Sequence, residues 1–255
     1  MQEFSARGVR IAFIDEAPVV ADRGEPILLI HGFASTHAIN WVFPQWVKTL
    51  TEAGRRVIAF DNRGHGRSEK FYDPAAYHIK EMCGDAIALL DHLGLQQVDV
   101  MGYSMGARIT AYLAWSHPER VRSAILAGLG YHLVDGAGLP LGIAEAMEAP
   151  SLDTLTDPMQ RMFRSFAEAT KSDLKALAAC IRGARQTMTE AQLGEIRQPA
   201  LVAVGTTDDV AGDPHKLAAL LPAAHVLPIP GRDHNRAVGD PVYKKGVVEF
   251  LLNRP

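Results

Sequence analysis

The sequence predicts an α/β protein with a mostly parallel central sheet, helices on both faces of that sheet and a helical cap insertion. Short aliphatic runs alternate with longer helical patterns, as they do where parallel strands are joined by helices. Residues 26–30 are almost purely aliphatic, which is typical of a strand buried on both faces. Residues 130–196, in contrast, contain helical patterns and no buried strand run.

The predicted strands are short runs rich in β-branched or aliphatic residues. They cover residues 9–14, 26–30, 57–60, 98–101, 123–127, 200–204 and 225–229. Helical patterns lie between or after them, at about residues 41–53, 75–93, 105–116, 213–221 and 240–252. Right-handed crossover connections place the carboxyl ends of such strands at one edge of the sheet, where ligands bind in folds of this class.

The region without strands has its own helical pieces. They lie at about residues 141–147, 158–169, 172–182 and 189–196, and Pro150, Pro158 and Gly183 separate them. A segment this long inside a compact domain needs structure of its own. We therefore expect a core of residues 1–129 and 197–255 and a helical cap of residues 130–196 over the sheet edge. The alternative is a plain additional layer of helices.

Composition narrows the class of protein. A chain of 255 residues with 47% hydrophobic and 22% charged residues is globular, which excludes disorder, collagen and coiled coil. Its net charge of −3 and the lack of a long basic run predict no nucleic-acid and no membrane partner. Cys83 and Cys180 are too few for a disulfide scaffold and are interpreted as small buried hydrophobic residues. No signal peptide or membrane span is visible, so we expect a cytoplasmic protein.

The segment Gly102-Tyr103-Ser104-Met105-Gly106 directly follows a predicted strand and directly precedes a helical pattern. A G-x-S-x-G sequence in this strand–turn–helix setting is a nucleophile elbow. The turn is sharp and strained, so side chains at the two glycines would collide across it. Backbone N–H groups at the start of a helix also favour developing negative charge. We predict that Ser104 is the nucleophile; the alternative is an ordinary turn in which Ser104 caps the helix.

Five motifs together resemble those of the α/β-hydrolase family, over nearly the whole chain. They are His31-Gly32-Phe33, Asp61-Asn62-Arg63-Gly64-His65-Gly66-Arg67-Ser68, the elbow, Gly205-Thr206-Thr207-Asp208 and Gly231-Arg232-Asp233-His234, in the family's order. The resemblance, to Ser-nucleophile, esterase-like members with a helical cap, implies the α/β-hydrolase fold, a Ser–Asp–His triad and hydrolysis of an acyl bond. It does not imply a substrate.

A serine hydroxyl needs a base within hydrogen-bonding distance to attack at neutral pH. The family order is serine, acid, histidine, which leaves the histidines after residue 104. His234 follows the last predicted strand, in a loop at the sheet edge where Ser104 should lie, and we predict that it is the base. The other histidines after residue 104 fit less well. His117 lies at the far end of the elbow helix, and His132 precedes the acid candidates. His215 lies in a helix start and His225 at a strand start.

The acid should follow the strand 200–204, where Asp208 and Asp209 are adjacent. The family's G-x-x-D spacing selects Asp208, which would hold the imidazole tautomer and stabilise the imidazolium. Asp209 remains an alternative, with turn capping as its other role. Asp213 is nearby, and Asp135 at the cap entrance is a remote choice.

The resemblance also implies an oxyanion hole formed by two backbone N–H groups. One follows the strand 26–30 and the other follows the nucleophile, which corresponds to Phe33 and Met105. We interpret His31 as structural, because the base role is already assigned. The segment 61–68 is interpreted as a tight glycine-rich loop held by its own ion pairs and hydrogen bonds.

The cap should select the substrate. Its inner face is expected to carry a stripe of methionine, leucine and aromatic residues: Met147, Leu155, Met159, Met162, Phe163 and Phe166. Such a stripe either packs in the core or faces an apolar substrate. From this stripe we take Met162 and Phe163 as candidate substrate-binding residues. Trp41, close behind residues 31–33 (hereafter the oxyanion loop), and Tyr131, at the start of the cap, are further candidates.

These patterns favour a serine hydrolase that cleaves a small or medium carboxylic ester. The expected partner is a small-molecule acyl substrate of apolar character. Ser104 replaces the Asp that epoxide- and halide-processing relatives carry at the elbow, which disfavours those reactions. No metal-binding or dinucleotide pattern appears, so we expect neither metal nor cofactor. The alternatives are C–C bond, thioester or lactone hydrolysis, perhydrolase or haloperoxidase-like chemistry, and a non-enzymatic ligand receptor.

Overall fold

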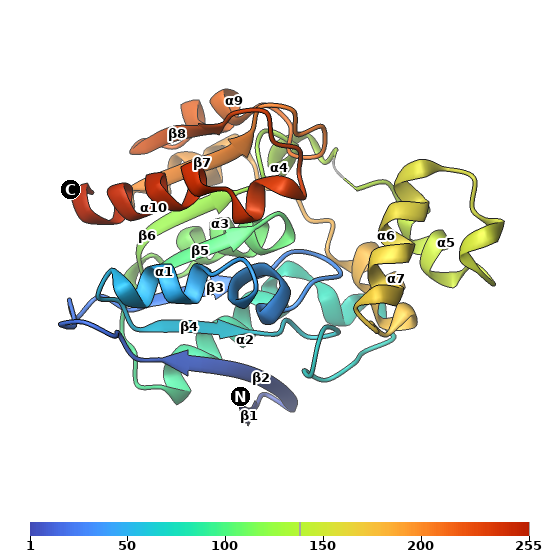
Figure 1. The fold of residues 1–255 in the computed structure, drawn as a ribbon, viewed down its shortest axis with the longest axis horizontal. Helices are drawn as coiled ribbons and strands as arrows, with labels where there is room; N and C mark the ends of the chain where they lie inside the picture. The colour runs from blue at the N-terminus through green and yellow to red at the C-terminus, as the bar shows by residue number, and fades with distance from the viewer. Residues whose placement is uncertain (138, 255) are drawn as a thin grey trace.

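The computed structural model describes residues 1–137 and 139–254. In this part of the chain, eight strands form one sheet in the order β1-β2-β4-β3-β5-β6-β7-β8 (Figure 1). The strands are β1 (Gln2–Ala6), β2 (Val9–Glu16), β3 (Ile27–Ile30), β4 (Val57–Phe60), β5 (Val98–Tyr103), β6 (Val121–Ala127), β7 (Ala200–Gly205) and β8 (Ala224–Ile229). Every pairing from β4 to β8 is parallel, which confirms the predicted mostly parallel sheet.

Strands β1 and β2 pair antiparallel to each other, and β2 pairs antiparallel to β4. Strand β1 is not among the predicted strands, because its five residues, QEFSA, are mostly polar. In this edge strand Phe4 is buried while its described neighbours are exposed. A one-faced edge strand therefore lacks the continuous aliphatic run that marks the inner strands.

Helices cover both faces of the sheet and leave two hydrophobic cores. Helices α1 (Trp46–Glu52) and α10 (Pro241–Asn253) pack on the face toward the viewer in Figure 1. Helices α2 (Ile79–His92), α3 (Met105–Ser116) and α9 (Pro214–Leu220) contribute to the core on the other face. Apolar residues on both faces of the parallel strands are removed from water, which is the main stabilisation of such a sheet.

Two predicted helices are interrupted. The predicted helix 41–53 consists of a single π-helical segment, η1 (Ala38–Val42), and then α1. Pro44 and the left-handed Gln45, with φ of 67°, separate them. The predicted helix 75–93 begins as a 3₁₀ turn, η2 (Pro74–Tyr77), and His78 is extended before α2 starts. Further 3₁₀ turns, η3 (Pro118–Arg120) and η5 (Arg236–Gly239), precede β6 and α10.

The segment between β6 and β7 is helical, as predicted. It contains α4 (His132–Asp135), α5 (Gly142–Glu148), η4 (Leu152–Thr154), α6 (Pro158–Ala169), α7 (Leu174–Gly183) and α8 (Glu190–Gly194). The side chains of Asp157, Asp173 and Thr189 cap the first turns of α6, α7 and α8. Helices α5, α6 and α7 form a lobe beside the carboxyl ends of the parallel strands (Figure 1).

Ion pairs and hydrogen bonds join the helices of the lobe, which comprises α5, α6 and α7. Arg182 of α7 forms two hydrogen bonds with Glu148 of α5, at 2.6 and 2.7 Å. Arg164 of α6 donates to the carbonyl groups of Ala146 and Ala149 at the end of α5. The Arg164 contacts satisfy carbonyl groups that the end of α5 would otherwise leave free.

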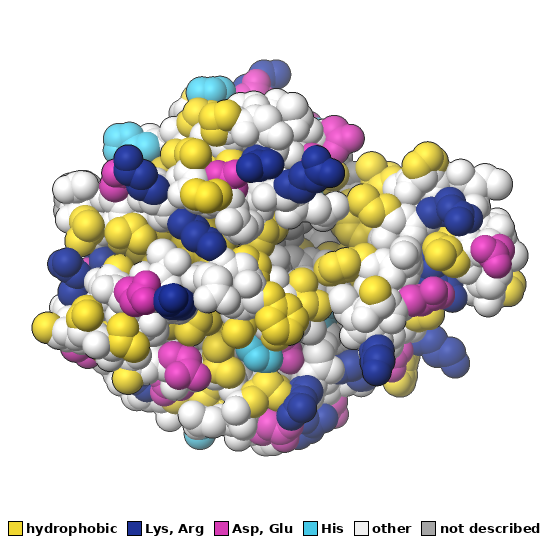
Figure 2. Space-filling view, in the orientation of Figure 1, with side chains coloured by type: hydrophobic (Ala, Val, Ile, Leu, Met, Phe, Trp, Pro, Cys, Tyr) yellow, Lys and Arg dark blue, Asp and Glu magenta, His cyan; other side chains and the backbone are white. Residues whose placement is uncertain are grey.

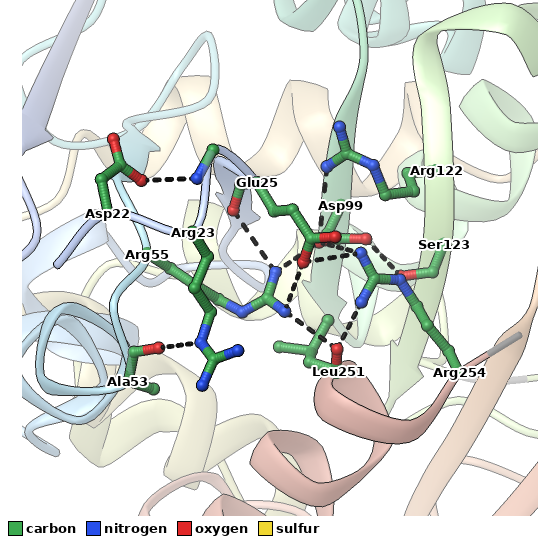
Figure 3. A network of polar contacts seen from close by, with 11 residues as sticks. Asp22, Arg23, Glu25, Ala53, Arg55, Asp99, Arg122, Ser123, Leu251 and Arg254 are labelled. Atoms are coloured by element: carbon green, nitrogen blue, oxygen red, sulfur yellow. Dashed lines mark hydrogen bonds and ion pairs between the residues drawn. The ribbon is translucent and has the colours of Figure 1, made fainter.

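A buried polar network lies at the amino ends of the parallel strands, opposite the lobe (Figure 3). Asp99, near the start of β5, accepts hydrogen bonds from Arg55 at 2.6 Å and from Ser123 at 2.7 Å. Arg254 reaches the same carboxylate, and Arg55 also donates to the Leu251 carbonyl at the end of α10. Burial raises the pKa of Asp99, against the hydrogen bond from Ser123 and the neighbouring arginines. The network ties α10 to the amino ends of the parallel strands.

Candidate active site

Ser104 lies on the sharp turn between β5 and α3. Its backbone is in an uncommon region, with φ of 54° and ψ of −111°. A Cβ atom on Gly102 would lie 2.1 Å from the Gly106 carbonyl oxygen, and one on Gly106 would lie 2.0 Å from that of Ile30. Only glycine fits at these two positions, because the elbow packs directly against its own backbone and against β3.

The loops that follow β5, β7 and β8 bring three side chains into one line. His234 Nε2 lies 3.0 Å from Ser104 Oγ, and His234 Nδ1 lies 2.8 Å from Asp208 Oδ2. The other carboxylate oxygen, Oδ1, accepts hydrogen bonds from the amides of Val210 and Ala211. The arrangement can pass the serine proton to the imidazole while the carboxylate holds the ring.

The environment of Asp208 keeps its carboxylate charged. Burial by itself would raise the pKa of Asp208, but the hydrogen bond from His234 and the two amide hydrogen bonds outweigh it. The net effect is a pKa below the ordinary value for aspartate. The Asp208 side chain is 0% exposed, whereas Asp209 is exposed to solvent.

Phe33 and Met105, the two predicted oxyanion-hole residues, line one cavity together with Ser104. Within the described residues, neither the Phe33 nor the Met105 amide donates a hydrogen bond to another protein group. The loop that carries Phe33 is held in place, since Asn40 Oδ1 accepts from the Gly32 amide at 2.8 Å. These free donors are the kind of group that stabilises an oxyanion.

His31 supports the same loop. Its Nε2 atom accepts a hydrogen bond from the Asn62 amide, so Nδ1 carries the proton and donates to the Gly32 carbonyl at 2.8 Å. Burial lowers the pKa of His31 to about 4, so the ring is neutral at neutral pH. This buried position agrees with the structural role that we predict for His31.

The segment 61–68 is held by hydrogen bonds of its own, as predicted, but its ion pairs are formed with residues outside it, which corrects that part of the expectation. Asp61 accepts hydrogen bonds from the ring and the amide of His37. Arg63 forms two hydrogen bonds of 2.7 Å with Asp85 of α2. Within the loop, Asp61 accepts hydrogen bonds from the Arg67 amide and the Ser68 hydroxyl. Long-range partners of this kind have no local signal in the sequence.

Two cavities flank Ser104. The larger, of about 370 Å³, is mainly apolar and is bordered by the oxyanion loop, the His234 loop and the lobe. Its lining includes Phe33, Ile39, Met162, Phe163, Phe166 and His234. The smaller cavity, of about 60 Å³, lies on the side of Met105 and Leu129. Figure 2 shows a hollow between the body of the molecule and the lobe, with hydrophobic side chains around it.

Residues 25–148 match the family model described as alpha/beta hydrolase fold. The chain has the α/β-hydrolase fold. The putative carbamate hydrolase RutD of Variovorax paradoxus is 29% identical over 255 residues, which covers 89% of this chain and 92% of that protein. Epoxide hydrolase B of Mycobacterium tuberculosis is 36% identical over 121 residues, which covers 48% of this chain. The chain spans about a third (33%) of the length of that curated relative.

The fold of this α/β-hydrolase is also found among solved structures. The enol-lactonase from Burkholderia xenovorans LB400 superimposes with a TM-score of 0.81 at 21% sequence identity. The superposition covers 99% of this chain and 100% of the other. This likeness concerns the arrangement of the backbone and leaves the substrate open.

The structure corrects two predicted substrate-binding residues of this α/β-hydrolase. Trp41 is 0% exposed and packs edge-on against Trp46 in the core beneath α1. Tyr131 donates its hydroxyl to Glu190 and has Lys216 over its ring, at the base of the helical segment. Neither residue lines either cavity beside Ser104. Proximity in sequence to the oxyanion loop or to the cap does not set the direction of a side chain.

The predicted methionine and aromatic stripe of the lobe divides between two environments. Met162, Phe163 and Phe166 line the larger cavity, and Met162 is 42% exposed. Met147 is buried in the core, and Met159 packs against it. Leu155 is only partly buried and borders neither cavity.

Two residues that support the site are missing from the sequence analysis. Tyr103 is buried, and its hydroxyl donates to the His234 carbonyl at 2.5 Å, which fixes the loop that carries the imidazole. Asn40 positions the oxyanion loop through Gly32. Tyr103 occupies a variable position of the elbow motif and Asn40 lies in no motif, so the sequence carries no signal for either.

No helix in residues 1–137 and 139–254 combines the length and apolar character needed to cross a bilayer. The same part of the chain contains no group of three or more His, Cys, Asp or Glu side chains arranged to hold a metal ion.

Proposed function

We propose that this protein is a serine hydrolase that cleaves a small or medium carboxylic ester through an acyl-serine intermediate. The observation that supports the proposal is the continuous line from Ser104 through His234 to Asp208, at 3.0 and 2.8 Å. Two free amides, of Phe33 and Met105, lie beside the serine. An activated hydroxyl next to two such donors is the arrangement that acyl transfer requires.

In the proposed acylation step, Ser104 Oγ attacks the ester carbonyl carbon and its proton moves to His234 Nε2. The carbonyl oxygen becomes an oxyanion, which accepts hydrogen bonds from the Phe33 and Met105 amides. Each such donor is worth about 2.7–4 kcal/mol of transition-state stabilisation. The C–O bond to the alcohol then breaks, the alcohol leaves with the proton from His234, and the acyl group stays on Ser104.

In the proposed deacylation step, water enters from the side that the alcohol has left. His234 Nε2 takes a proton from the water, and the hydroxide oxygen attacks the acyl carbon. The C–O bond to Ser104 breaks, the proton returns to Oγ, and the carboxylic acid is released. Asp208 remains ionised throughout and stabilises the imidazolium in both steps.

The larger cavity supports a small-molecule substrate with an apolar group. The volume of about 370 Å³ lies within the usual range of ligand pockets, and its lining of Ile39, Phe163 and Phe166 favours hydrocarbon groups. His234 lines this cavity, so the leaving group, which takes its proton, would occupy it. The epoxide chemistry named for one relative is not carried over, because a hydroxyl stands at the elbow of this chain.

The test is hydrolysis of 4-nitrophenyl esters graded from acetate to long chains. We expect turnover by the wild type and a loss of about 10⁴-fold or more in Ser104→Ala and His234→Ala, with the fold unchanged. Ser116→Ala, at the other end of helix α3, is the matched control and should retain full activity. Wild-type-like turnover in either site variant, or none in the wild type, would contradict the proposal.

A further inference from the structure

The smaller cavity beside Ser104 contains two positively charged side chains. Arg108, on α3 one turn after the nucleophile, and Arg185, just after α7, both line it. The rest of the lining is mostly apolar or small and includes Phe33, Met105 and Leu129. A guanidinium pair in such a lining is unexpected in a site built only for hydrocarbon groups.

Neither arginine has an acidic partner within residues 1–137 and 139–254. Arg108 uses Nη2 for the carbonyl groups of His132 and Ala137, which leaves Nε and Nη1 without protein acceptors. Arg185 uses Nη1 for the Leu139 carbonyl. Arg108 is half-buried and Arg185 is exposed. The buried arginines Arg55 and Arg63 do have carboxylate partners. A half-buried guanidinium without a carboxylate partner at a cavity therefore suggests an external partner.

The charges of the two arginines act on each other. Burial and the charge of Arg185 lower the pKa of Arg108 to about 10, and the nearby Asp135 compensates only in part. Arg108 therefore remains charged at neutral pH. The Asp135 carboxylate accepts a hydrogen bond from the Ala137 amide and forms no ion pair with Arg108. A bound anion would offset both the burial of the Arg108 guanidinium and the repulsion between Arg108 and Arg185.

We propose that this cavity binds a carboxylate carried by the acyl part of the substrate. The inference rests on the proposed function, since it assigns the two cavities to the two halves of an ester. His234 lines the larger cavity and not the smaller, so the leaving group belongs to the larger and the acyl group to the smaller. A planar carboxylate matches the fork of guanidinium donors.

The size of the cavity limits the acyl group. A volume of about 60 Å³ holds about four water-sized groups, if each needs about 15 Å³. That is enough for a carboxylate on a short stem. The substrate class is therefore a monoester, or a cyclic ester, of a short dicarboxylic acid, with the larger apolar group on the alcohol side.

Turnover of matched esters tests the charge preference. We expect the wild type to have a kcat/KM at least about tenfold higher for 4-nitrophenyl hydrogen glutarate than for 4-nitrophenyl methyl glutarate. Arg185→Gln and Arg108→Lys should reduce this ratio by about tenfold or more. Arg182→Gln is the matched control, because Arg182 is an exposed arginine of α7 paired with Glu148 and should leave the ratio unchanged. Equal ratios in all four proteins would overturn the proposal.

A binding measurement separates this inference from the proposed reaction. Monomethyl glutarate is titrated into Ser104→Ala and into Ser104→Ala/Arg185→Gln by calorimetry. We expect binding to the first and at least about tenfold weaker binding to the second. Binding of this kind without ester turnover by the wild type would retain the carboxylate site and reject the ester hydrolase. Ester turnover with no difference between the two variants in binding would reject the carboxylate site alone.

Discussion

The two adjacent carboxylates after β7 have different environments at the scale of single residues. Asp208 is buried, contacts His234 Nδ1 at 2.8 Å and accepts two backbone hydrogen bonds. Asp209 is exposed to solvent. The turn that follows Gly205 directs one side chain toward the sheet edge and the next away from it. Only the first can hold the tautomer in which Nε2 is free to accept the serine proton.

Separate asparagine variants test this difference. Asp208→Asn should lower kcat for a 4-nitrophenyl ester by about 10⁴-fold, because the neutral amide neither holds that tautomer nor stabilises the imidazolium. Asp209→Asn should change kcat by less than about threefold, as a surface substitution does. A larger loss in Asp209→Asn than in Asp208→Asn would reverse the assignment of the acid.

At the scale of elements, the lobe is attached to the core through a close backbone contact. Helix α7 ends at Gly183, and a Cβ atom there would lie 1.9 Å from the Pro74 carbonyl oxygen of η2. The end of α7 and η2 therefore pack without an intervening side chain. This contact positions the lobe, whose Met162 and Phe163 line the larger cavity.

Gly183→Ala should loosen this attachment and destabilise the protein by about 1–3 kcal/mol, as overpacking does. Gly194→Ala is the matched control, because a Cβ atom at Gly194 in α8 meets nothing within 4 Å. That control should leave the stability unchanged or raise it by up to about 1 kcal/mol. Urea unfolding followed by circular dichroism measures both, and equal stabilities in the two variants would contradict this account of the contact.

At the scale of the whole molecule, the amino ends and the carboxyl ends of the parallel strands carry different buried polar groups. The amino ends of the parallel strands hold the ion-pair network around Asp99 (Figure 3). The carboxyl ends hold the candidate site and, behind it, two buried histidines. Burial lowers the pKa of His31 to about 4 and that of His65 to about 3, both from an ordinary value of 6.5. Protonation of His31 would also remove the hydrogen bond that its Nε2 atom accepts from the Asn62 amide.

This burial makes the stability depend on pH. Below pH 6.5 the unfolded chain takes up protons on both histidines, whereas the folded protein does not until the pH nears 4. The free energy of unfolding should therefore fall as the pH decreases from 6.5 to 5, by about 1.4 kcal/mol per pH unit for each histidine. Urea unfolding at several pH values measures the slope. His65→Gln should reduce it, and an unchanged slope in that variant would exclude His65 as a source.

The sequence by itself determined the alternation of strands and helices, the parallel sheet and the helical segment between β6 and β7. It also identified Ser104 and His234 as candidates, because the elbow and the loop after the last strand are local motifs at ends of strands. Only the tertiary structure decided that Trp41 points into the core and that Asp208 rather than Asp209 contacts His234.

The tertiary structure also brought Arg108 and Arg185 to one cavity from segments far apart in the chain. The physical reason is that the periodicity of apolar residues is local and can be read along the chain. The direction of a side chain and the partners around it depend instead on how distant segments pack together.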